Sequence, residues 1–108
     1  MNKQSLVALA RTELEMARAA SSGRSARTVY GGHERRLRQT LIALISPARL
    51  DEHHGPGEAT LQVLSGRVRL SAGEHSWEGM SGDLLIVPGE LHVLDALEDA
   101  AVLLTVVK

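Results

Sequence analysis

The sequence contains no cysteine among its 108 residues, so neither a disulfide framework nor a thiolate metal site is possible. Phenylalanine is also absent, and Trp77 and Tyr30 are the only Phe, Tyr or Trp side chains in the chain. A hydrophobic core must therefore be built from Leu, Val, Ile and Ala. An internal pocket would offer few rings on which a flat aromatic ligand could stack.

Neither sign of charge dominates, and no apolar run is long. Twelve Lys and Arg residues face thirteen Asp and Glu residues, which gives a net charge of −1 and no reason to expect nucleic acid or a membrane as a partner. Arg11 and Glu13 interrupt the apolar stretch near the N-terminus, which is not typical of a signal peptide, and no run approaches a transmembrane span. We expect a cytosolic protein of one domain.

Residues 3–20 have the spacing of an amphipathic helix. Leu6, Ala10, Leu14 and Ala17 recur on one face, and Val7 widens that apolar stripe. Ser21, Ser22 and Gly23 follow as a stop signal. The pattern predicts a helical arm over residues 1–24 and a separate unit over residues 25–108. The apolar stripe needs a surface to cover, either on its own domain or on a partner chain.

From residue 27 the pattern changes to short strands separated by turns. Residues 60–64 and 67–71 form the clearest hairpin, because apolar and polar residues alternate on both sides of Ser65-Gly66. Many short strands at close spacing predict an all-β sandwich or barrel. The predicted strands are 27–30, 37–45, 60–64, 67–71, 75–78, 84–87, 91–94 and 101–107.

Three stretches carry a resemblance to a known family. The first is EHHGPGE at 52–58, followed by LQVLSGRVRL, the second is GDLLIVP at 82–88, and the third is His92. Cupins show a His-x-His cluster, a Glu and a Gly in their first motif, then Gly, five residues, Pro and a further His. From residue 47 the chain therefore resembles the small single-domain, RmlC-like cupins. The resemblance implies a cupin-type β-barrel or jelly roll, and a homodimer.

The resemblance also implies a site for one divalent metal, Fe, Mn, Ni, Zn or Cu, inside the barrel mouth. Two ligand sets remain open: His53, His54, Glu58 and His92, or His54, His92 and Glu52. A barrel without metal, in which His92 caps a core strand, is an equally well supported interpretation.

Two departures from the family pattern weaken the metal site. The usual Glu lies seven residues before the turn glycine, and counting back from Gly66 reaches Ala59, which cannot bind metal. Glu58 is one residue away, and on a strand a slip of one residue points a side chain to the opposite face. His53 and His54 are adjacent, so on extended backbone only one of them faces inward.

Other polar residues have structural interpretations. We interpret His33 as a surface turn residue, His75 as part of a hairpin strand, and Trp77 as barrel packing. The charged run from Glu34 to Arg36, with Arg38, is typical of a solvated strand edge, and an anion site is the alternative. Two glutamines inside apolar strands fit either a pocket lining or the wet face; they are Gln39 and Gln62.

Functions of different classes remain open. The first is a binding or sensing protein that holds a small-molecule ligand, with or without a metal, in an aliphatic pocket beneath His92. The second is a metal-dependent enzyme, such as a small dioxygenase or isomerase. Ala59 at the expected Glu position favours the first over the second. A third is a regulatory protein that acts through its helix on a partner. Since no DNA-binding motif accompanies the barrel, direct DNA binding would need a separate chain.

Overall fold

The structure, a computed structural model, describes residues 2–53 and 57–108, without the side chains of Glu52 and His53. One helix, α1 (Leu6–Ala19), precedes the strands, and none of the described helical residues form a span long and apolar enough to cross a membrane. The strands are β1 (Arg24–Tyr30), β2 (Leu37–Leu44), β3 (Arg49–His53), β4 (Glu58–Ser65), β5 (Arg67–Ala72), β6 (His75–Met80), β7 (Leu84–Ile86), β8 (His92–Ala96) and β9 (Ala100–Val107).

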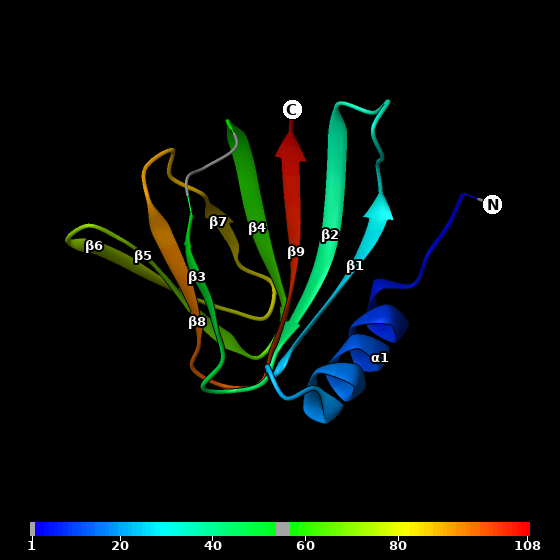
Figure 1. The fold of residues 1–108 in the computed structure, drawn as a ribbon, viewed down its shortest axis with the longest axis horizontal. Coiled ribbons are helices and arrows are strands. Elements are labelled where there is room, and N and C mark those ends of the chain that lie inside the picture. The colour runs from blue at the N-terminus through cyan, green and yellow to red at the C-terminus, as the bar shows by residue number, and fades with distance from the viewer. Residues whose placement is uncertain (1, 54–56) are drawn as a thin grey trace.

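The strands form two antiparallel sheets. The larger sheet has the order β1-β2-β9-β4-β7, and the smaller sheet has the order β3-β8-β5-β6. Their inner faces share one core, to which the larger sheet contributes Leu44 and Val63 and the smaller sheet contributes Val68 and Leu94. Figure 1 shows the sheets meeting at one end and diverging toward the end where the C-terminus lies. This arrangement confirms the predicted all-β fold with an N-terminal helix.

One strand was not expected from the sequence. The segment Arg49–His53 forms β3, although Leu50 is its only aliphatic residue and no alternation marks it. It pairs with β8 at the edge of the smaller sheet, where only one side needs a partner. The predicted boundary at residue 24 falls on the first residue of β1.

Helix α1 packs on the outer face of the larger sheet, beside β1 and β2 (Figure 1). Ala10 is buried against Leu41 and Ala101, and Ala17 is fully buried. Val7 leaves 72% of its surface exposed, so it is not buried on its own barrel, and its burial against a partner chain stays a prediction. The buried stripe runs instead through positions 10, 13 and 17, which are three and four residues apart.

Position 13 in this stripe is a carboxylate. Glu13 is 1% exposed, and the Ser25 hydroxyl donates to its Oε1 at 2.6 Å. Nε of Arg27 donates to its Oε2 at 3.1 Å. Both partners lie on β1, so the buried charge ties the helix to the edge strand of the larger sheet. The sequence pattern gave no sign of this contact, because a charged residue inside an apolar stripe is ordinarily assigned to the wet face.

We expect Glu13→Gln to lower the free energy of unfolding by about 1–3 kcal/mol, since a charge-assisted hydrogen bond is lost while Ser25 and Arg27 keep their polar groups. Glu15 is exposed on the same helix, and Glu15→Gln should change stability by no more than about 0.5 kcal/mol. Urea unfolding of both variants measures the difference. Equal midpoints for the two would contradict the anchoring role of Glu13.

The turn between β4 and β5 depends on a glycine. Gly66 has a φ of +79°, and a Cβ at this position would collide with the carbonyl oxygen of Asp99. Gly73, in the turn between β5 and β6, has a φ of +58° but nothing within 4 Å of such a Cβ. The two glycines therefore share a backbone conformation and differ in crowding.

Gly73→Ala should cost about 1–2 kcal/mol, which is the penalty of left-handed backbone for an L-residue. Gly66→Ala should cost a further ~1–3 kcal/mol, because the backbone of Asp99 and Ala100 must move. Guanidinium unfolding of the two variants isolates the steric contribution. Similar losses in both variants would show that the hairpin does not pack closely on the β8–β9 turn.

Candidate functional site

The candidate site lies at the end where the sheets diverge, which we call the mouth. Strand β3 ends at His53 and β4 begins at Glu58, so the short connection between them places both strand ends at the mouth. The backbone N–H of Val87 donates to the carbonyl of Ala59 at 3.1 Å, and β8 starts five residues later at His92. The two cupin-like motifs are therefore brought together here.

His92 is the best-defined polar residue of the mouth. It is 5% exposed and lies on the same face of β8 as the buried core residues Leu94 and Ala96. Its Nδ1 is 2.9 Å from the carbonyl oxygen of Glu90. Because a carbonyl oxygen can only accept, Nδ1 carries the hydrogen, and in the neutral ring Nε2 holds the lone pair. This is the tautomer in which a histidine accepts a hydrogen bond or binds a metal through Nε2.

An irregularity in β3 decides which residue lies opposite His92. Leu50 pairs with Leu94, and uninterrupted pairing would then place position 52 opposite position 92. The register shifts between Leu50 and His53, so that His53 pairs with His92 instead. Directly opposed residues of antiparallel strands belong to the same face of a sheet, so the bulge assigns position 53 to the face of His92.

None of the remaining candidate ligands is shown to lie beside His92. Glu58 is exposed, and it lies on the face of β4 opposite to the buried residues Ala59, Leu61 and Val63. The structure therefore does not bring Glu58 to His92. As the sequence predicted, the offset of one residue from Ala59 places Glu58 on the opposite face of the strand. His54 lies outside the described residues. Glu52 belongs to β3, and because of the register shift it is not the residue that pairs with His92.

The described residues do not complete a metal site. In residues 2–53 and 57–108 no group of three or more His, Asp or Glu side chains is arranged to hold an ion. His92 has the tautomer of a ligand, but no described carboxylate lies on the inner face at the mouth. One described imidazole falls short of the three or four donors that a cupin-type site needs.

The larger sheet contributes a different kind of group to the mouth. Val106 of β9 is buried in the core, and its partners in the register are Arg38 on β2 and Ala59 on β4. Arg38 therefore lies on the inner face of the sheet, where it is half-buried. Thr40, two residues further along β2, shares this face and is also half-buried.

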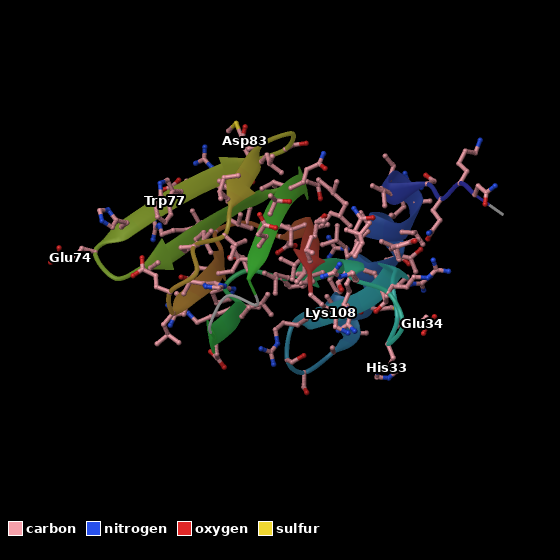
Figure 2. All side chains as sticks on the ribbon, turned by 90° about the horizontal axis from the view of Figure 1, so that it is seen from above. His33, Glu34, Glu74, Trp77, Asp83 and Lys108 are labelled. Atoms are coloured by element: carbon pink, nitrogen blue, oxygen red, sulfur yellow. The ribbon has the colours of Figure 1, made fainter. Side chains whose placement is uncertain are left out.

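The other candidate side chains, those of His33, His75 and Trp77, are all exposed to some degree. His33 is exposed in a turn, as expected, and His75 is exposed on β6. Trp77 pairs with the buried Leu70, so it lies on the inner face of the smaller sheet, where it borders a pocket with Leu85 and Pro88. It is 44% exposed and stacks on His75 with ring centroids 6.1 Å apart, so its packing in the barrel is only partial. Figure 2 shows Trp77 on the side of the molecule opposite His33 and Glu34.

Both glutamines lie on the outer face of the larger sheet. Gln39 pairs with Thr105 in the register, and its Nε2 donates to the Thr105 hydroxyl at 3.2 Å. Gln62 is exposed between the buried residues Leu61 and Val63. The alternative in which they line an internal pocket is therefore not supported by their placement.

Comparison with known proteins finds matches among solved structures, whereas no protein-family model and no curated protein match the chain. A conserved protein of unknown function from Streptococcus pyogenes is 27% identical, with a TM-score of 0.72 over 82% of this chain and 77% of that chain. A cupin superfamily protein from Desulfitobacterium hafniense is 14% identical, with a TM-score of 0.71 over 78% and 76%.

A cupin 2 conserved barrel domain protein from Leptotrichia buccalis is 21% identical, with a TM-score of 0.73 over 82% of this chain and 43% of that chain. These likenesses show that the chain has the fold of a small cupin domain, which confirms the resemblance carried by its motifs. One of the three proteins has no known function and the other two are described by fold alone, so a function must be argued from the site.

Proposed function

We propose that the protein binds a small molecule between its two sheets at the mouth, beneath His92, and acts as a binding or sensing module. The observation that supports this most strongly is the buried His92 ring, whose Nδ1 is committed to the Glu90 carbonyl so that Nε2 is the acceptor. A fixed polar group in aliphatic surroundings is the usual composition of a small-molecule site.

The inner face around the mouth supports binding better than catalysis. Ala59, Leu61 and Val106 supply apolar surface, and Ala59 occupies the position where the family pattern has its carboxylate. A carboxylate at this place would serve as a metal ligand or as a proton acceptor. Its replacement by the methyl group of Ala59 removes both roles.

The alternative is a metal-dependent enzyme, such as a small dioxygenase or isomerase. The pairing of His53 with His92 favours this alternative, because it assigns two imidazole-bearing positions to one face. Such a centre would take its remaining donors from positions 52–54, and a bound divalent metal would supply Lewis-acid or redox chemistry. The two functions differ in how tightly the protein holds metal.

The protein, purified without a polyhistidine tag and dialysed, should retain far less than one metal ion per chain, because two imidazoles without a carboxylate bind metal weakly. Added Zn²⁺ or Ni²⁺ in excess should still raise the midpoint of thermal unfolding, and His92→Ala should abolish that rise. Elemental analysis and thermal unfolding provide the two measurements.

His33→Ala and His75→Ala are the controls, since His33 is exposed in the turn before β2 and His75 is exposed on β6, two strands away from His92 in the smaller sheet. His53→Ala should match His92→Ala if the register assigns it correctly. A tightly held ion in about one-to-one ratio, lost in His92→Ala but kept in His75→Ala, would establish the enzyme-type metal centre and overturn the simple binding role.

We also propose that two copies of the chain associate through the outer face of the larger sheet. The groove between α1 and β4 measures about 360 Å³ and is bordered by Val7 and Leu64. Beyond it, β7 exposes 59% of Leu84 and 70% of Ile86, which are paired in register with the outward residues of β4. An apolar strip therefore runs from the helix to the sheet edge, interrupted at β4 by the outward side chains of Thr60 and Gln62.

Charge on this strip favours a second copy as its occupant. Arg11 and Glu15 both border the groove, so the strip carries charges of both signs side by side. A two-fold axis places the same patch on both sides of an interface, and a patch with both signs can complement itself. Association of this kind would cover Val7, which the single chain leaves exposed.

Val7→Asp should shift the protein from two-chain to one-chain mass, because a charge would be buried in the apolar strip. Met16→Asp is the matched control: it is also exposed on α1, and nine residues of helix place it on the opposite side from Val7. Light scattering measures both masses. A wild type with the mass of one chain, or equal loss of association in both variants, would contradict this interface.

A further inference from the structure

We infer that the ligand of the mouth is a small organic anion, an aliphatic carboxylate, and that Arg38 binds its charged group. This inference rests on the proposed function, since it names the chemical class of the molecule bound beneath His92. The charged run around Arg38 had a solvated strand edge as its first interpretation. The register of the larger sheet separates Arg38 from the rest of that run.

The placement of Arg38 follows from the pairing of three strands. Arg38 on β2 and Ala59 on β4 flank the same residue of β9, Val106, which is buried in the core between the sheets. Arg36, by contrast, precedes β2 and is exposed. Arg38 therefore belongs to the inner face of the larger sheet. It lies at the mouth end of this sheet, as His92 does in the smaller sheet.

Arg38 has no counter-ion within the described part of the chain. Three arginines on outward faces are each paired with a carboxylate: Arg27 with Glu13, Arg49 with Asp95 and Arg69 with Glu78. Arg38 makes no ion pair or side-chain hydrogen bond with the residues the structure describes, although it is half-buried. A partly desolvated cation without a partner is costly, and a ligand that supplies the negative charge removes the cost.

The surroundings restrict the class of anion. A guanidinium binds a carboxylate through two parallel hydrogen bonds, and the Thr40 hydroxyl on the same face of β2 is a further donor. The adjoining inner residues, Leu61, Leu104 and Val106, are aliphatic. Glu58 lies on the outward face of β4 and Asp95 is paired with Arg49, so neither competes with the ligand for Arg38. A carboxylate with an aliphatic chain would pair with the Arg38 guanidinium and pack its chain on these aliphatic side chains.

The test uses butyrate as the probe and butyramide as its neutral analogue, at matched ionic strength, with the full-length protein. Butyrate should raise the midpoint of thermal unfolding and butyramide should raise it much less. Arg38→Gln should weaken butyrate binding roughly tenfold to a hundredfold, the usual effect of losing a charge-assisted hydrogen-bonded pair. Arg36→Gln, an exposed neighbour with the same change of charge, should leave the affinity unchanged.

Arg38→Lys separates charge from geometry, because it keeps the charge and loses the paired hydrogen bonds, and it should fall between wild type and Arg38→Gln. If butyramide binds as well as butyrate and neither responds to Arg38→Gln, the anion assignment is wrong while a small-molecule site remains. If inorganic phosphate protects and butyrate does not, the carboxylate class is wrong. If no probe shifts the wild type, the inference fails, and the His92→Ala metal measurements still decide the proposed function independently.

Discussion

The register of β9 against its two neighbours is the constraint on which the other placements depend. β9 is the central strand of the larger sheet and pairs along its length with β2 and β4. Since side chains alternate between faces, a displacement of one residue would exchange the inner and outer sets completely. The alignment of Val106 with Arg38 and Ala59 therefore determines which side chains of these strands face the core and the mouth and which face outward.

The smaller sheet departs from strict pairing at one place, and that place belongs to the site. Between Leu50 and His53, two residues of β3 correspond to one residue of β8. Bulges of this kind commonly re-aim a side chain beside a functional site. Here the bulge replaces position 52 by position 53 opposite His92. The larger sheet contributes a cation to the mouth by regular pairing, whereas the smaller sheet contributes its histidine position through an irregularity.

The features that the sequence predicted correctly are those with a local signal. The hairpin around Gly66, the turn at Gly82-Asp83 and the inward position of Ala59 follow from alternation and turn chemistry. The features it missed depend on contacts between distant segments. Strand β3 has no alternation of its own, and Glu13 is buried only because Ser25 and Arg27 lie twelve and fourteen residues away. Trp77 was assigned to barrel packing, and it does lie on the inner face opposite Leu70, but it remains 44% exposed and stacks on His75.

The fully buried core residues Leu44, Val63, Val68 and Val102 lie toward the closed end, whereas Arg38, Thr40, Ala59 and His92 lie at the mouth. If the mouth binds a ligand as proposed, stability and recognition depend on different ends of the same strands. Substitution of Arg38 or Thr40 would then change the ligand without opening a cavity among the fully buried residues, and a lineage could explore new ligands at little risk of unfolding. Such a division offers a physical reason why one barrel can be inherited by proteins with unrelated ligands.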